Sequence, residues 1–154
     1  MTVFDPFKIH PMVPYHLSYS GLNRDDIGRK NPDLLRQLLC NPDTRFLPVW
    51  ASQNFFSNSK KPLSAMCFLR KENVARFLDK AEIIYLGFDR GREPYVCIDL
   101  SRYEKAMLDP LAKFGVFGDL RESDSSISGD DGSIMGYARA MCYWHSKNKH
   151  CSSC

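Results

Sequence analysis

The chain has 154 residues, of which 44% are hydrophobic, 12% aromatic and 25% charged, and its net charge is +3. This composition is typical of one ordinary globular domain, and it excludes a disordered tail, a collagen-like repeat and a coiled-coil rod. A net charge this small gives no argument for nucleic acid or acidic membranes as partners. No apolar run approaches the roughly 20 residues of a membrane span, and the N-terminus does not resemble a secretory signal. We therefore expect a cytoplasmic protein with no membrane partner.

The first third of the chain is predicted to be mostly irregular, with one helix. Residues 1–31 carry several prolines, and within them 24–30 is expected to be a charged, exposed link. Asn31 is a suitable helix N-cap, and the proline that follows it fits the first helical position. The leucines after it have helical spacing, so we expect a helix that ends near Cys40.

The next segment is predicted to form two strands joined by a loop. Residues 44–50 have the pattern of a strand. Because proline has no amide hydrogen, Pro48 favours either an edge position or one in which its amide side is left unpaired. Residues 53–62 are rich in Asn, Ser and Lys and are expected to be a polar hairpin loop. The nearly continuous apolar run at 63–69 predicts a second strand, buried on both faces.

The middle of the chain alternates between helical and strand patterns. Residues 72–81 are predicted to form a helix, followed by strands at 82–88 and 95–100. The glycine-containing segment 89–94 between these two strands is typical of a hairpin turn. Residues 101–114 form a weaker helical pattern, which Pro110 interrupts.

The last segment contains the clearest helix. Residues 115–121 are expected to be a short strand or loop, 122–132 a flexible acidic loop, and 133–147 a helix. Because hairpin pairs of strands are mixed with helices and no repeat is visible, the pattern favours an α+β fold with a mixed or antiparallel sheet and flanking helices.

The six cysteines fall into two groups. Four lie among apolar neighbours and are interpreted as small buried hydrophobic residues, namely Cys40, Cys67, Cys97 and Cys142. Cys151 and Cys154 instead form a Cys-x-x-Cys pair in a polar, basic setting. Two thiolates at this spacing can bind one tetrahedral zinc ion, and a structural zinc site has four ligands. The missing pair of a zinc ribbon is expected about 12–20 residues further on.

Other interpretations of the cysteine pair remain open. A redox pair of the thioredoxin type normally begins a helix, whereas this pair follows one. His145 and His150 could serve as further zinc ligands.

Acidic pairs offer a weaker case for metal binding. Asp25-Asp26 and Asp130-Asp131 each stand in a polar stretch without a companion ligand, and Asp130 or Asp131 fits better as a helix N-cap. The chain contains no phosphate-binding loop, nucleophile elbow or paired zinc histidines, so its own residues indicate no active site.

The C-terminal helix and its sequel carry a family resemblance. A helix ending in Trp144-His145, then a basic turn, then Cys151-x-x-Cys154, resembles the NADH pyrophosphatase family of Nudix hydrolases. Three upstream stretches, at 19–24, 41–50 and 117–121, are similar to segments of the same family. The resemblance covers the chain from about residue 17 to residue 154.

The resemblance implies a domain organisation. Residues 1–130 would be the Nudix-like N-terminal domain, 131–150 a connecting helix, and 151–154 the first half of a truncated zinc ribbon. The Nudix signature, Gly-x5-Glu-x7-Arg-Glu-U-x-Glu-Glu-x-Gly-U with U a bulky aliphatic residue, does not occur. Its nearest fragment, 121–126, has serine where the paired glutamates belong. We therefore expect the Nudix catalytic domain to be absent and this span to be inactive.

The resemblance also implies a function for the parent enzyme. Such an enzyme hydrolyses the pyrophosphate of NADH or NAD to nicotinamide mononucleotide and AMP, with Mg or Mn bound in the catalytic domain. Cys151 and Cys154 would be two of four structural zinc ligands, and the enzyme would be a homodimer. Some family members also act on NAD-capped RNA ends, so RNA is a partner only in that case.

Two other functions are alternatives to the Nudix interpretation. One is a stand-alone interaction module that binds zinc between chains, and the other is a small Cys-x-x-Cys redox protein. Tyr137, Met141 and Trp144 are interpreted in every case as core or interface packing rather than ligand stacking.

Overall fold

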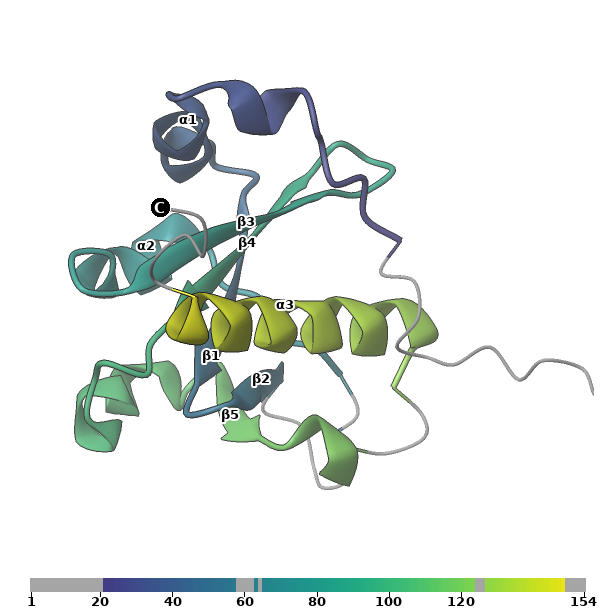
Figure 1. Cartoon of the computed structure of the whole chain (residues 1–154). Coiled ribbons are helices and arrows are strands. Elements are labelled where there is room, and N and C mark those ends of the chain that lie inside the picture. Colours follow the sequence, from purple (N-terminus) through teal and green to yellow (C-terminus); the bar gives the residue numbers. More distant parts are fainter. Residues whose placement is uncertain (1–20, 58–62, 64, 124–126, 149–154) are drawn as a thin grey trace, which may run out of the picture.

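A five-stranded mixed sheet organises the molecule in the computed structural model (Figure 1), which describes residues 21–57, 63, 65–123 and 127–148. The strand order is β3-β4-β1-β2-β5; β1 and β4 are parallel, and every other neighbouring pair is antiparallel. The strands are β1 (Arg45–Trp50), β2 (Gln53–Ser57), β3 (Glu82–Phe88), β4 (Pro94–Asp99) and β5 (Gly115–Gly118). The predicted α+β class with a mixed sheet is confirmed.

Helices cover both faces of this sheet. The α-helices are α1 (Leu34–Cys40), α2 (Lys71–Val74) and α3 (Gly129–Lys147), and the 3-10 helices are η1 (Gly28–Lys30), η2 (Ala75–Phe77), η3 (Lys105–Leu111) and η4 (Leu120–Glu122). The long helix α3 lies across one face (Figure 1). No helix within the described residues is long and apolar enough to cross a membrane.

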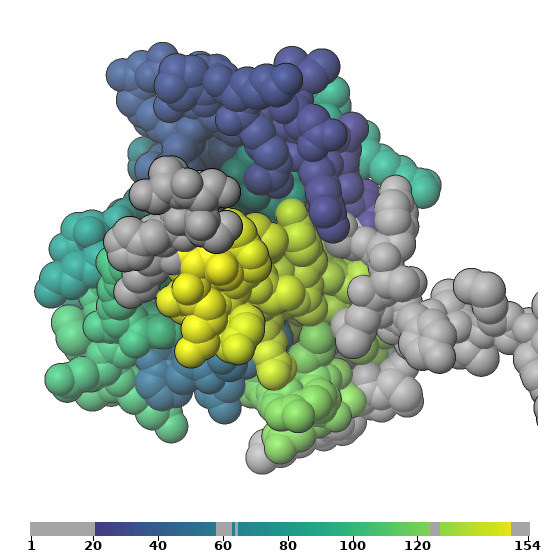
Figure 2. Space-filling view, viewed as in Figure 1, coloured from purple at the N-terminus to yellow at the C-terminus, as the bar shows by residue number. Residues whose placement is uncertain are grey.

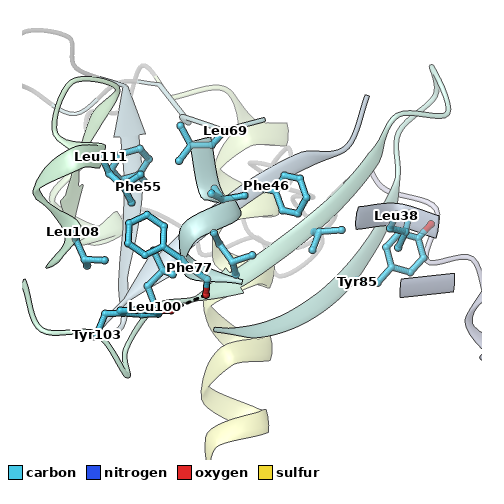
Figure 3. Packing of buried hydrophobic residues seen from close by; sticks show 13 residues of the cluster. Leu38, Phe46, Phe55, Leu69, Phe77, Tyr85, Leu100, Tyr103, Leu108 and Leu111 are labelled. Atoms are coloured by element: carbon cyan, nitrogen blue, oxygen red, sulfur yellow. Dashed lines mark hydrogen bonds between the residues drawn. The ribbon is translucent and has the colours of Figure 1, made fainter. Parts of the chain in front are cut away.

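The two faces of the sheet bury two separate apolar clusters because side chains alternate along each strand. In β4, Val96 and Ile98 point to the face covered by the short helices, whereas Cys97 points to α3. Figure 3 shows the first cluster, in which the Phe77 and Tyr103 rings meet edge to face at 5.3 Å. The Tyr103 hydroxyl also donates a hydrogen bond to the Phe77 carbonyl at 2.9 Å.

The predicted loop at 53–62 is wrong in its first half, which forms β2. Phe55 and Phe56 are buried there, and the buried side-chain amide of Asn54 donates to the Met135 carbonyl of α3 at 2.8 Å. The polar residues of this segment led to the prediction of a loop. The sequence pattern could not show that a carbonyl of α3 accepts the hydrogen bond from Asn54 and so allows this polar side chain to be buried. Residues 58–62 lie outside the described part.

Of the two positions predicted for Pro48, the edge of the sheet is wrong, because β1 lies between β4 and β2. The other, an unpaired amide side, is confirmed, because Pro48 has no partner in β2. Pro48 is tolerated there because β2 pairs only with Val49 and Trp50. On the same side, Phe46 instead exchanges two backbone hydrogen bonds with Leu69. Pro48 therefore lies between the pairing of Val49 and Trp50 with β2 and the pairing of Phe46 with Leu69, where no backbone amide hydrogen is needed.

The predicted strand at 63–69 is not a strand. Its described residues make two isolated bridges, one from Leu69 to Phe46 of β1 and one from Met66 to Phe56 of β2. The segment thus fills the gap where β1 and β2 diverge, which explains its apolar composition without a regular ladder.

The segment 24–30, predicted to be a charged, exposed link, is mostly exposed, and it is also anchored to the sheet. The backbone groups of Asn23 and Phe88 exchange hydrogen bonds of 2.8 and 3.0 Å. The Arg29 guanidinium donates to the carbonyls of Tyr85 and Leu86 at the edge strand β3. Several charged side chains remain exposed, but the backbone extends the edge of the sheet.

Helix ends differ from the sequence expectation by a few residues. Helix α1 begins at Leu34 after a turn in which Asn31 accepts from the amide of Asp33, and it ends at Cys40 as predicted. Cys40 itself is exposed, so its interpretation as a buried residue is wrong.

The other predicted helices are confirmed in part. The range predicted as a helix at 72–81 overlaps the short helices α2 and η2, which together run from Lys71 to Phe77. Residues 101–114 contain the 3-10 helix η3 with Pro110 inside it. Helix α3 begins earlier than predicted. Its N-cap is Ser128, whose hydroxyl accepts from the Asp131 amide at 3.0 Å, rather than either aspartate.

Candidate interaction surface at the end of the C-terminal helix

The predicted zinc ligands Cys151 and Cys154 lie outside the described residues, as does His150. The structure does place His145, near the end of α3, with its Nδ1 atom 3.0 Å from Oε1 of Glu82 in β3. Within the described ranges, no three His, Cys, Asp or Glu side chains are grouped to bind a metal ion. The described residues nearest in sequence to Cys151 and Cys154 are those of the last turns of α3.

A narrow apolar stripe fixes α3 on the sheet. Ile134, Ala138 and Cys142 are four residues apart and almost fully buried, because this spacing places them on one face of a helix. They pack with Leu47 and Val49 of β1 and with residues of β3 and β4. The stripe determines which side chains of the last turns face outward.

An ionic contact also holds α3, at its middle. The Asp119 carboxylate accepts hydrogen bonds from Arg121 and, at 3.0 Å, from Arg139 of α3. The guanidinium and backbone amide of Arg121, followed by Arg139, hold the pKa of Asp119 well below its ordinary value. A pair that joins η4 to α3 is thus ionised over the whole neutral range.

One side of the helix end borders an open cleft of about 520 Å³. The Glu82 carboxylate lies there between His145 and Arg102. Its Oε1 atom is 3.0 Å from Nδ1 of His145, and its Oε2 atom is 4.0 Å from the Arg102 guanidinium. All three side chains are about one-third exposed or more, so these pairs contribute little to stability. The cleft is lined by Leu35, Ala81, Glu82, Ile83, Arg102, His145 and Asn148.

The other side borders a smaller hollow of about 270 Å³, between α3 and the β1–β2 turn. Arg139, Cys142, Tyr143 and Ser146 line it from α3.

Two large aromatic side chains project outward between the cleft and the hollow. Tyr143 is 61% exposed and Trp144 is 55% exposed. The Trp144 ring meets the His145 ring edge to face at 5.2 Å, and the Lys147 ammonium lies 5.8 Å from the Tyr143 ring. Figure 2 shows the last turns of α3, in yellow, at the surface of the molecule.

These groups suit recognition of another surface better than chemistry on a small molecule. Adjacent exposed aromatic rings with polar groups at their rim are typical of protein interfaces. We call Tyr143, Trp144, His145, Glu82 and Arg102 the α3-end surface.

The sequence predicts only part of this surface. Trp144 is expected in core or interface packing; its 55% exposure excludes the core, and the interface stays a prediction. Tyr137 and Met141 are half-buried against the core, as expected. Glu82 and Arg102 were missed because they are distant in sequence from α3, and an isolated charge at a strand end carries no signal. Tyr143 could have been found, since it lies off the buried stripe.

Comparison with known proteins agrees with this fold. Residues 43–144 match the family model described as NUDIX-like, the NADH pyrophosphatase-like rudimentary NUDIX domain. The matched segment runs from just before β1 to the last turn of α3 and contains the whole sheet. A search of the curated proteins finds no match. The chain therefore belongs to the family of NADH pyrophosphatase-like rudimentary NUDIX domains.

Proposed function

We propose that this domain is the non-catalytic, N-terminal part of a Nudix hydrolase that cleaves the pyrophosphate of NAD(H) to nicotinamide mononucleotide and AMP. The family match over the whole sheet is the observation that supports the proposal. NAD-capped RNA ends would be further substrates only in a parent enzyme that accepts them. The proposal keeps the cytoplasmic location expected from the sequence.

The residues of this span do not fit the catalytic metal of such an enzyme. The Nudix signature with its metal-binding glutamates does not occur in the 154 residues. The described residues, moreover, contain no group of carboxylates placed to hold a divalent ion. Mg or Mn therefore belongs, in this proposal, to a separate catalytic domain, and no step of the hydrolysis is assigned to residues 21–148.

The donor set of the C-terminal pair does suit zinc. Cys151 and Cys154 supply two soft thiolates at a spacing that favours one tetrahedral ion, and they follow α3 by a few residues. They would supply two of four ligands. A closed site of four thiolates has no open position for chemistry, so the zinc would fix the junction that follows α3.

A comparison of two proteins tests the catalytic assignment. The 154-residue chain and the entire product of its gene would each be incubated with NADH and Mg²⁺ or Mn²⁺, and AMP release measured. We expect release by the gene product and none by the chain. Release by the chain would refute the non-catalytic role, and no release by either would refute the NAD(H) pyrophosphatase assignment.

Zinc content tests the metal assignment separately. Elemental analysis of the gene product should give about one zinc per chain, and Cys151→Ala or Cys154→Ala should remove it. Cys40→Ala is the matched control because Cys40 is exposed and distant from the pair in sequence. Zinc retained in both pair variants would contradict the proposed ligands.

We further propose that two copies associate through the α3-end surface. Tyr143 and Trp144 support this assignment because exposed aromatic side chains at a helix end contribute strongly to interfaces when buried. A two-fold axis would bring the same patch of both copies together.

A further inference from the structure

Two buried thiols from distant parts of the chain meet under α3. The Sγ atoms of Cys97, in β4, and Cys142, in α3, are 3.2 Å apart. Cys97 is 0% exposed and Cys142 is 5% exposed. The two residues are separated by 45 positions in sequence, so their contact depends on the docking of α3.

The packing around the pair explains how the sulfur atoms come so close. Ala138 lies one turn before Cys142 on the same face of α3, and it is fully buried. Its small side chain lets the helix approach β4, and the Cys97 sulfur is 3.9 Å from the Ala138 carbonyl. The two other described cysteines lie elsewhere, with Cys40 exposed at the end of α1 and Cys67 beside the Phe114 carbonyl.

The small hollow beside α3 borders one of the two cysteines. Cys142 lines this hollow together with Arg139 and Ser146, whereas Cys97 does not. The hydrogen bond to Cys142, followed by burial, raises the pKa of the Cys97 thiol well above its ordinary value. Cys142 is therefore the thiol that a small oxidant can reach first.

We propose that Cys97 and Cys142 form a peroxide-oxidisable dithiol that closes into a disulfide clamping α3 onto β4. The Cys142 sulfur attacks one oxygen of hydrogen peroxide and the O–O bond breaks. The departing hydroxide takes the Cys142 thiol proton and leaves as one water, and Cys142 becomes a sulfenic acid. The Cys97 sulfur then attacks the Cys142 sulfur. The S–O bond breaks, and the hydroxide leaves with the Cys97 proton as a second water. Two thiols are thus oxidised and one peroxide is reduced.

The clamp would close a long loop and hold the helix that leads to the zinc pair. A cross-link between residues 97 and 142 restricts the unfolded chain strongly, because stabilisation grows with loop length. It does not depend on the proposed pyrophosphatase function, since it uses only residues of the described fold.

Peptide mapping of the full 154-residue chain tests the proposal. The reduced protein is treated with hydrogen peroxide, its free thiols are alkylated in denaturant, and it is digested with trypsin without reductant. We expect peptide 93–102 to be linked to peptide 140–147, at the sum of their masses less two hydrogens. The oxidised chain should also unfold at a temperature higher by about 10 °C.

Matched variants attribute that shift to the pair. Cys97→Ala and Cys142→Ala should lose the linked peptide and the rise in unfolding temperature, whereas Cys40→Ala should keep both. If Cys97→Ala or Cys142→Ala fails to fold, the presence or absence of the linked peptides 93–102 and 140–147 in the wild-type chain decides whether the disulfide forms. Sulfinic or sulfonic acid at Cys142 with an unlinked Cys97, or links from these two cysteines to others, would overturn the proposal.

Discussion

The turn between β1 and β2 places two ordinary residues in the left-handed region. Ala51 has φ 48° and Ser52 has φ 63°, in a two-residue connection between Trp50 and Gln53. Positive φ at both positions is the geometry of a type I′ turn, which favours Asn followed by Gly. An L side chain is strained in this conformation, whereas glycine is not.

Ser52→Gly should therefore stabilise the protein. We expect the free energy of unfolding to rise by about 0.5–1 kcal/mol in urea denaturation, because glycine has no Cβ atom and adopts the left-handed conformation without strain. Ala75→Gly is the matched control, since Ala75 is exposed with a helical φ of −50°. That change should destabilise the protein. A Ser52 variant less stable than wild type would show that the turn is not strained.

Asp119 gives the fold a predictable dependence on pH. Its pKa is lower in the folded protein than the ordinary 3.8, because Arg121 and Arg139 stabilise the carboxylate. A depressed folded pKa contributes stability that is present above the unfolded pKa and is lost as pH falls through the folded value. The contribution is thus complete at neutral pH and declines from about pH 4 downward.

Asp119→Asn should lower the unfolding temperature at pH 7, and the difference from wild type should shrink in acid below pH 4. Thermal unfolding from pH 2 to pH 8 measures both curves. Asp33→Asn, which breaks an exposed pair with Arg36, should follow wild type at every pH. A constant gap between Asp119→Asn and wild type would exclude the ionic explanation.

At the scale of elements, a bulge in β3 determines how the segment 21–30 joins the sheet. The register of β3 against β4 shifts between Tyr85 and Gly87, and Gly87 has φ 137°. A Cβ atom at Gly87 would lie 2.2 Å from the Asn23 carbonyl oxygen. Only glycine allows the Asn23 backbone to bridge Phe88.

Gly87→Ala should detach this segment. We expect a loss of about 2 kcal/mol in the free energy of unfolding and faster amide exchange at Asn23 and Phe88, because both the strained φ and the backbone clash oppose the native pairing. In Gly91→Ala the nearest atom is an Asp89 side-chain oxygen at 3.3 Å, so that variant should stay close to wild type. Unchanged exchange in Gly87→Ala would refute the anchoring role.

The elements that sequence patterns predicted well are those whose burial is local. The β3–β4 hairpin and α1 follow from turn residues and periodicity within a few positions. The errors arose where a distant partner decides the structure. Asn54 is buried in β2 because Met135, 81 residues later, accepts its amide, and Pro48 sits centrally because two neighbours share one side of β1. No window of residues contains that information.

At the scale of the whole molecule, the α3-end surface was harder to predict than the fold. Its carboxylate and imidazole come from positions 63 residues apart, and only the docking of α3 brings Glu82 to His145. The prediction that Tyr137 and Met141 pack against the core is confirmed. Trp144 continues their helical spacing, so the sequence could not show that its side chain is 55% exposed.

The proposed homodimer makes a prediction for this surface. Two adjacent exposed aromatic residues, repeated by a two-fold axis, would place four rings in one interface. Truncation of central aromatic residues typically costs about 2 kcal/mol or more each. The double variant Tyr143→Ser/Trp144→Ser should therefore weaken self-association at least about 100-fold.

Sedimentation equilibrium of the gene product measures this change in the dissociation constant. Ile27→Ser is the matched control, because Ile27 is 86% exposed and lies in the segment before η1, which contributes no residue to the α3-end surface. It should leave the dimer intact, since removing an exposed apolar side chain outside the interface changes no contact between copies. A wild-type protein that stays monomeric at about 100 μM, far above the Kd of interfaces of standard size, would contradict the dimer. A double variant that associates as wild type does would instead place the interface elsewhere on the molecule.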